Sequence, residues 1–227
     1  MTLITEQKAR IDARIRSAAL AAGRNPSGIR ILGVSKRQPR ERVAAALAAG
    51  IRDLGENYLQ DAMARITEFG SAARWHFIGR VQSNKTRPIA QHFDWVQTVC
   101  DRRIARRLSS QRPVHAAALD VCIQIAPWEQ PERGGALPET VPALAEEIEA
   151  LPRLRLRGLM VMPLPGRDAE DLAAEFRAAR ALYDRLCEAG HALDTLSMGM
   201  SDDLEIAVAA GSTMLRIGTA LFGPRKD

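Results

Sequence analysis

The sequence has few of the residues that mark a nucleic-acid-binding surface. Aromatic residues make up 4% of the chain, and the net charge of +5 comes from arginines that are interspersed with acidic residues. No run of five like charges occurs. A nucleic-acid interface needs a concentrated basic stripe or stacking aromatic side chains. We therefore predict no nucleic-acid partner and interpret the charge as a solvated surface.

Cysteine and histidine are also scarce. The three cysteines form no CxxC pair, and the four histidines show no metal-ligand spacing. No apolar run is long enough to span a membrane, and the N-terminus has no hydrophobic leader segment. We expect reduced thiols in a cytoplasmic protein, with no metal site and no membrane partner.

Two common catalytic motifs are missing. No expected strand is followed by GxGxxG. This absence disfavours a dinucleotide-binding sheet, which is the alternative to the barrel fold predicted below. No GxSxG is present, which disfavours a serine hydrolase.

The chain does contain a regular alternation of strand and helix patterns. After a first amphipathic helix over residues 4–22, helical patterns follow at 39–50, 58–69, 82–91, 101–110, 138–151 and 168–189, and Ser201-Asp202-Asp203 is expected to cap one more helix. Apolar strand patterns cover 29–35, 51–54, 75–78, 93–99, 117–125, 154–162, 195–197 and 213–217. This order predicts an α/β fold: a single (β/α)8 TIM-type barrel over residues 1–227, with an extra N-terminal helix.

Lysine is rare and therefore informative. Only four of the 32 basic residues are lysines, and Lys36 alone ends an apolar strand pattern, Ile31-Leu32-Gly33-Val34-Ser35. An amine can lose its proton when desolvated and then attack a carbonyl, whereas a guanidinium stays protonated. The alternative is a lysine that extends its charge to water from a strand end.

Other polar residues follow the expected strands at the same barrel end, where barrel enzymes place their sites. The loops after strands seven and eight have the glycines and hydroxyls of a phosphate site, although Ser201 could be only a helix cap and Gly218 only a turn residue. Arg216 lies inside an apolar strand, where a cation needs an acceptor. The pyridine nitrogen of a ligand would suit it, and the alternative is an ion pair with Glu56 or Asp203. The converging candidates are Lys36, Asn57, His76 as a possible pocket wall, Ser197, Ser201, Arg216, Gly218 and Thr219.

Several motifs together resemble the YggS-type pyridoxal phosphate (PLP) homeostasis proteins. They are Gly33-Val34-Ser35-Lys36, Leu54-Gly55-Glu56-Asn57-Tyr58, Trp75-His76-Phe77-Ile78-Gly79, Arg157-Gly158-Leu159-Met160, Leu196-Ser197-Met198-Gly199-Met200-Ser201-Asp202-Asp203 and Arg216-Ile217-Gly218-Thr219. The resemblance implies a barrel of PLP fold type III, like the N-terminal domain of alanine racemase. It also implies an internal aldimine on Lys36 and Asn57 beside the cofactor. By the same resemblance, Ser201, Gly218 and Thr219 hold the phosphate, and Arg216 faces the pyridine nitrogen.

The loop after the fifth strand departs from the family. Ala126 and Arg133 stand where the family usually has an asparagine and a lysine, before Gly135. A role for that lysine in passing PLP between sites is therefore in doubt, because an arginine cannot form an imine. We expect this Pro- and Gly-rich loop, 126–137, to be mobile. The sequence does not determine whether it closes over the mouth of the barrel.

The expected function is PLP storage and vitamin B6 homeostasis without an obvious catalytic activity. PLP-dependent apoenzymes are possible recipients, and we expect a monomer or a weak dimer. The alternative is an amino-acid racemase, which needs a second base opposite the lysine. The only tyrosines are Tyr58, near the mouth, and Tyr183, on an outer helix. A PLP-free barrel for phosphorylated sugars is a third alternative.

Overall fold

The computed structural model describes residues 3–126 and 134–223, and in these residues eight parallel strands close into a barrel in chain order. The strands are β1 (Arg30–Val34), β2 (Asp53–Glu56), β3 (Arg74–Phe77), β4 (Trp95–Val99), β5 (Leu119–Ile125), β6 (Leu154–Val161), β7 (Thr195–Ser197) and β8 (Met214–Ile217). The register pairs Val34 with Gly55 across β1 and β2, and Leu32 with Arg216 across β1 and β8. The predicted barrel is confirmed.

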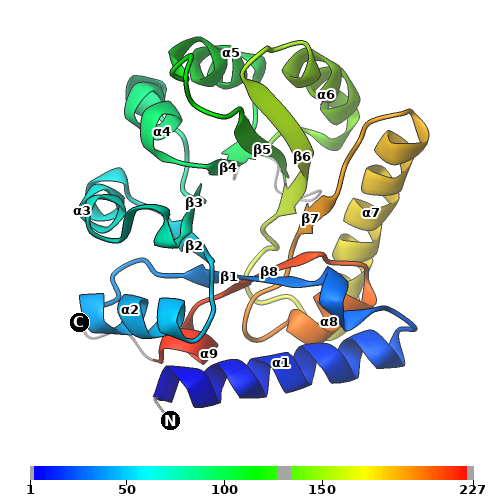
Figure 1. Ribbon diagram of the computed structural model, residues 1–227. Helices are drawn as coiled ribbons and strands as arrows, with labels where there is room; N and C mark the ends of the chain where they lie inside the picture. The colour runs from blue at the N-terminus through cyan, green and yellow to red at the C-terminus, as the bar shows by residue number, and fades with distance from the viewer. Residues whose placement is uncertain (1–2, 127–133, 224–227) are drawn as a thin grey trace.

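Helices surround the strands on the outside (Figure 1). They are α1 (Leu3–Ala21), α2 (Arg40–Ala48), α3 (Leu59–Phe69), α4 (Thr86–His92), α5 (Arg102–Gln111), α6 (Val141–Glu149), α7 (Ala169–Glu188), α8 (Leu204–Ala209) and α9 (Thr219–Phe222). The extra N-terminal helix α1 packs against α2, α8 and α9. It therefore covers the side of the barrel where β8 meets β1.

Helix periodicity and strand burial together build the core. In α7, the buried side chains Leu172, Phe176, Ala179, Leu182 and Leu186 recur every three or four residues and form one apolar face. The strands are buried on both faces, so β4 and β8 have no exposed position. The main core therefore lies between the barrel wall and the helices.

Helix caps follow the sequence prediction in one case and differ from it in another. The Asp101 carboxylate accepts a hydrogen bond from the Ile104 amide at 2.8 Å and caps α5 as expected. The predicted side-chain cap of α8 is wrong. Asp203 instead accepts from the Met200 amide and closes the loop before the helix.

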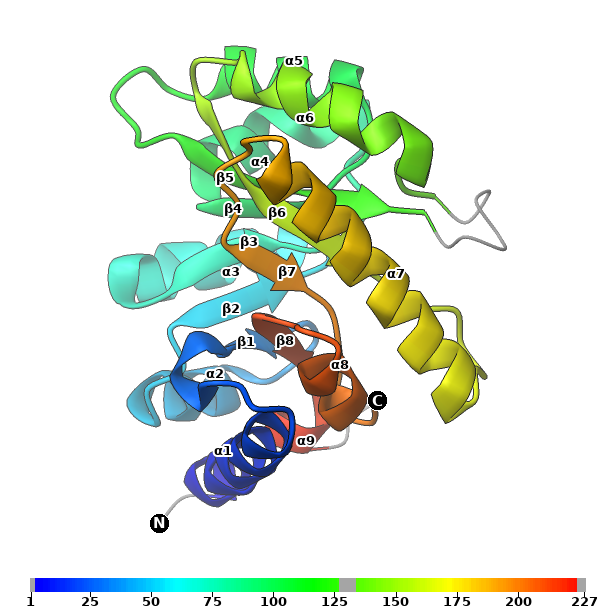
Figure 2. The same ribbon diagram turned by 90° about the vertical axis from the view of Figure 1, so that its right-hand side faces the viewer.

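The N-terminal end of the barrel is closed by paired charges. Asp120 accepts hydrogen bonds from Arg155 Nε at 2.5 Å and from Arg157 Nη1 at 2.8 Å. The guanidinium carbons of Arg30 and Arg157 lie 5.3 and 4.7 Å from the centre of the Trp95 ring. The strand arrows all point away from this end (Figure 2), so the other end is the one available for a site.

Candidate functional site

Lys36 lies on a tight turn directly after β1. Its side chain is half-buried, and the preceding residue is fixed to the barrel because the Ser35 amide donates to Gly55 O at 3.1 Å. The following residue, Arg37, has a φ of +57° and is the only non-glycine with positive φ among the described residues. Non-glycine residues seldom adopt this conformation, and such strain is common at functional sites. The turn thus holds Lys36 at the C-terminal mouth of the barrel.

A buried network fixes this turn on both sides of Lys36. The Ser35 hydroxyl donates to Glu56 Oε1 at 2.5 Å, and Arg65 Nη1 donates to the same oxygen at 2.7 Å. Arg65 Nη2 donates to Gln38 O at 2.8 Å. Glu56 is 0% exposed, and burial raises the pKa of its carboxyl although Ser35 and Arg65 partly offset that effect.

Sequence reasoning missed this network. Glu56 was named as a possible partner of Arg216 and as part of a family motif, and Arg65 was not a candidate. The available signal was weak: a glutamate next to a buried strand and an arginine on the following helix.

Asn57 follows β2 and also lies at the mouth. Its Oδ1 atom is buried and has no hydrogen-bond partner in the described part of the chain. A buried polar atom normally has a partner, so this oxygen is suited to a donor on a ligand. The backbone is tightly packed here, because a Cβ on Gly79 would lie 2.1 Å from Asn57 O. The position of Asn57 therefore depends on that glycine.

The two predicted phosphate loops lie side by side. The Ala220 amide, at the start of α9, donates to Ser201 Oγ at 3.3 Å. Ser201 and Gly218 are half-buried, and Thr219 is exposed. The conformation of the first loop requires a glycine at position 199. Gly199 has a φ of +95°, and a Cβ there would lie 2.4 Å from Ala207 Cβ. Hydroxyls and backbone amides from both loops can therefore approach one anion.

Arg216 points into the barrel beneath this mouth, as predicted, and is 3% exposed. Its Nη1 donates to Ser197 O at 2.8 Å and to Ser197 Oγ at 3.0 Å, and its Nη2 donates to Val161 O at 2.7 Å. Burial lowers the pKa of Arg216 to about 10, so the side chain remains a cation at neutral pH. Neutral oxygens thus hold this charge.

The alternative of an ion pair for Arg216 is not observed among the described residues. Glu56 pairs with Arg65, and the Asp203 carboxylate accepts from the Met200 amide. A buried cation whose hydrogen bonds all go to neutral groups can still interact with an anion or a ring nitrogen from a ligand.

Two of the predicted site residues, His76 and Ser197, are buried more deeply than the others. Both are 0% exposed, and a contact of either with a ligand stays a prediction. His76 lies in the barrel interior, where it stacks on Trp95 with ring centroids 4.9 Å apart. Ser197 accepts a hydrogen bond from Arg216, and the role of His76 as a pocket wall stays a prediction.

The loop after β5 can be followed only in part. The Ala126 amide donates to Ala136 O at 2.8 Å, and the Ala136 amide donates to Gln124 O at 2.7 Å. Arg133 lies outside the described residues. The question of whether the loop closes over the mouth concerns that same part of the chain.

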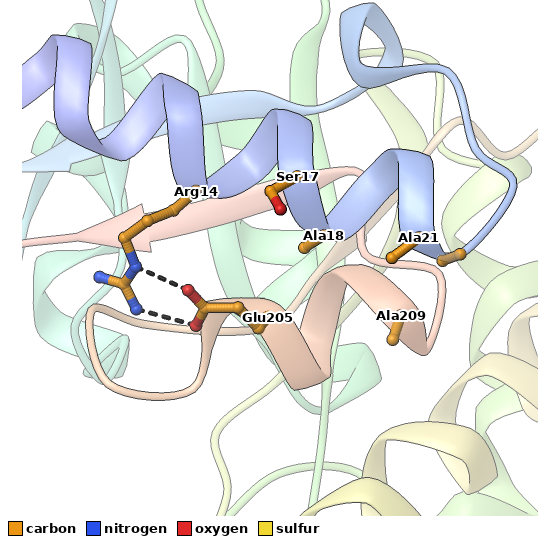
Figure 3. Close-up of a pocket in the computed structure, with 7 residues that line it drawn as sticks. Arg14, Ser17, Ala18, Ala21, Glu205 and Ala209 are labelled. Atoms are coloured by element: carbon orange, nitrogen blue, oxygen red, sulfur yellow. Dashed lines mark hydrogen bonds and ion pairs between the residues drawn. The ribbon is translucent and has the colours of Figure 1, made fainter.

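Two surface hollows lie beside α8. A groove of about 460 Å³ between α1 and α8 is lined mostly by alanines, and its charged groups, Arg14 and Glu205, already pair at 2.7 and 2.8 Å (Figure 3). A cavity of about 600 Å³ beside the Ser201 loop is lined by Met162, Leu164, Met200 and their neighbours. Neither includes the predicted lysine.

Comparisons with known proteins agree with this geometry. Residues 9–226 match the family model "Alanine racemase, N-terminal domain". The pyridoxal phosphate homeostasis protein of Pseudomonas aeruginosa is 51% identical over 99% of this chain and 97% of its own length. That of Escherichia coli is 42% identical over 99% and 98%. No helix within the described ranges is long and apolar enough to cross a membrane.

A solved structure shows the same architecture with a ligand. PipY of Synechococcus elongatus, with PLP bound, has 33% sequence identity and a TM-score of 0.84, over 97% of this chain and 100% of that one. The chain belongs to the pyridoxal phosphate homeostasis proteins, a family with the alanine racemase N-terminal domain fold.

Proposed function

We propose that this protein binds PLP at the C-terminal mouth of its barrel, with Lys36 as the covalent attachment point. Lys36 Nζ forms a C=N bond with the cofactor's aldehyde carbon, and water leaves. The observation that carries the proposal is the meeting of the Lys36 turn, the buried Arg216 cation and the two touching loops at one barrel end.

Each remaining contact has a physical reason. Ser201, Gly218 and Thr219 bind the phosphate through hydroxyls and backbone amides of two loops already in contact. Asn57 offers the ligand a buried oxygen that lacks a partner among the described residues. Arg216 faces the pyridine nitrogen, and a guanidinium there keeps that nitrogen unprotonated.

This arrangement favours storage over catalysis. Bound PLP supplies an electron sink for carbanions, and that property weakens when the ring nitrogen carries no proton. We therefore assign the protein to PLP homeostasis: it holds a reactive aldehyde and releases it to PLP-dependent apoenzymes, as a monomer or a weak dimer. All three cysteines are free thiols, which fits a cytoplasmic location.

The racemase alternative depends on a second base opposite Lys36. Tyr183 is buried on α7 and lies away from the mouth. Tyr58 follows Asn57. The guanidinium carbon of Arg37 lies 5.7 Å from the centre of its ring, so this ring already has a cation as its neighbour. Turnover should be measured on alanine and a panel of amino acids. Turnover that disappears in both Lys36→Ala and Tyr58→Phe would establish the racemase instead.

The cofactor proposal is tested by the visible spectrum of the protein with and without added PLP. We expect a yellow protein and, after borohydride reduction, one stable adduct that peptide mapping places on Lys36. Lys36→Ala should give no adduct, while Lys85→Ala, which removes an exposed lysine, should label like the wild type. No chromophore on the wild type, or a main adduct on another lysine, would contradict the proposal. A colourless protein would favour the phosphorylated-sugar alternative.

A further inference from the structure

A continuous row of hydrogen bonds runs through the barrel interior from Arg216 to the closed end. Arg216 Nη1 donates to Ser197 Oγ at 3.0 Å, and the Ser197 hydroxyl donates to Gln97 Oε1 at 2.7 Å. The Gln97 amide nitrogen lies 3.1 Å from His76 Nδ1, and His76 Nε2 lies 2.9 Å from Asp53 Oδ1. The elements involved are β8, β7, β4, β3 and β2.

The chemistry of the groups allows only one direction for these hydrogen bonds. Arg74 Nη2 donates to Asp53 Oδ2 at 2.8 Å. Burial alone would raise the pKa of Asp53, but the hydrogen bond from His76 and the neighbouring Arg74 lower it overall. An ionised carboxylate only accepts, so His76 Nε2 carries the proton. Burial lowers the pKa of His76, which leaves the ring neutral and Nδ1 an acceptor.

The Gln97 side chain is fixed from both sides as a result. Its N–H2 group must face His76 Nδ1, and its carbonyl oxygen must accept from Ser197. The Ser197 hydroxyl is then oriented so that its lone pairs point to Arg216. Each member is buried, so water does not substitute for a missing partner.

We propose that Gln97 is a positioning residue for the cofactor: it fixes the Arg216 guanidinium through Ser197 and anchors that orientation on the His76–Asp53 pair. This inference rests on the proposed function and assigns a role to polar residues that never touch the ligand. A guanidinium held only at Ser197 O and Val161 O could rotate, whereas the Ser197 hydroxyl adds a third, directional contact.

The test compares PLP with an analogue whose ring nitrogen is replaced by C–H. Dissociation constants for both are measured by absorbance titration on the wild type, Gln97→Leu and Ser197→Ala. The wild type should prefer PLP. Loss of one net hydrogen bond, ~1 kcal/mol, should reduce that preference about fivefold in either variant. Thr86→Val, which removes the hydrogen bonds of a buried threonine to Ser83 O and from Arg107 Nε outside the barrel interior, should keep it unchanged.

The outcomes separate the two proposals. A wild type that binds neither compound would overturn the proposed function and this inference with it. Binding of PLP with the same preference in all variants, or with no preference in the wild type, would overturn only the inference.

A second measurement does not depend on the ligand. Nitrogen NMR of the folded wild type should show His76 as the neutral Nε2–H tautomer. In Gln97→Glu the carboxylate has no hydrogen for Nδ1, so His76 should become an imidazolium at neutral pH despite the nearby Arg30 and Arg74. An Nδ1–H tautomer of a neutral ring, in the wild type or in Gln97→Glu, would overturn the proposed direction of the row.

Discussion

Replacing Glu56 with alanine should destabilise the barrel and loosen the turn that carries Lys36. The substitution removes the acceptor shared by Ser35 and Arg65. Arg65 is then left nearly buried, with a side-chain exposure of 14%, and keeps its bond to Gln38 O. An unpaired buried cation is costly, so we expect a loss of about 3–5 kcal/mol in the free energy of unfolding.

That loss is large enough to measure by thermal unfolding. For a chain of this size ~1 kcal/mol shifts Tm by roughly 2–4 °C, so Glu56→Ala should lower Tm by roughly 6–20 °C. Glu56→Gln keeps one acceptor oxygen and should cost less, about 1.5–3 kcal/mol. Glu68→Ala is the matched control, because it breaks an ion pair with the exposed Arg40, which contributes at most about 1 kcal/mol.

The same carboxyl gives a pH dependence of known sign. Its pKa is raised in the folded chain. As the pH falls toward the ordinary glutamate value, ~4.3, the folded chain takes up a proton before the unfolded chain does. The contribution of Glu56 to the free energy of unfolding is therefore largest at acidic pH. It decreases as the pH rises through the pKa of the folded state. Glu56→Gln should remove this contribution in denaturant titrations across the range.

Two results would refute this reasoning. One is a Glu56→Ala variant that unfolds at the same temperature as Glu68→Ala. The other is a Glu56→Gln variant whose unfolding free energy keeps the full pH dependence of the wild type. Slower or weaker PLP uptake by Glu56→Ala, measured from the chromophore, would link the network to Lys36.

Two further predictions concern packing and thiol reactivity. Gly79→Ala places a Cβ 2.1 Å from Asn57 O, so it should lower the free energy of unfolding by about 1–3 kcal/mol and weaken PLP binding. In the control, Gly28→Ala, the new Cβ meets no atom within 4 Å, so neither effect is expected. Equal unfolding curves and PLP affinities for the two variants would contradict this. Cys122 is fully buried, and burial raises its pKa to about 12, so a thiol reagent should label at most two cysteines in the folded protein and three after denaturation. Three fast reactions in the folded state would contradict it.

The barrel could be predicted from the sequence because its strands are buried on both faces. Such strands read as short apolar runs between turn signals, and β7 was placed at its observed bounds. β2 was placed two residues early, at 51–54, because the observed strand, Asp53–Glu56, contains two acids. Their partners, His76 and Arg65, lie on other elements, and a local pattern cannot show that these charges are compensated.

The site was predictable as far as chain order determines it. Strand ends meet at one face of a barrel, so Lys36, Asn57 and the two loops could be brought together without knowing any contact. Gln97 could not be found in this way, because its partner Ser197 is 100 residues away. The available signal was its type: like Arg216, it is a polar residue inside an otherwise apolar strand pattern.

The distribution of charge inside the barrel explains why only one end is suited to an anionic cofactor. At the closed end, Asp120 and Asp53 are each paired with cationic arginines, so those charges are compensated within the protein. Toward the mouth, Arg216 is held by neutral oxygens of Ser197 and Val161. The row of hydrogen bonds connects it to Asp53, and the carboxylate of Asp203 is near enough to raise its pKa, against the lowering by burial, although no hydrogen bond joins the two groups. Its charge is therefore only partly compensated within the protein, and a phosphorylated ligand at the mouth can complement it.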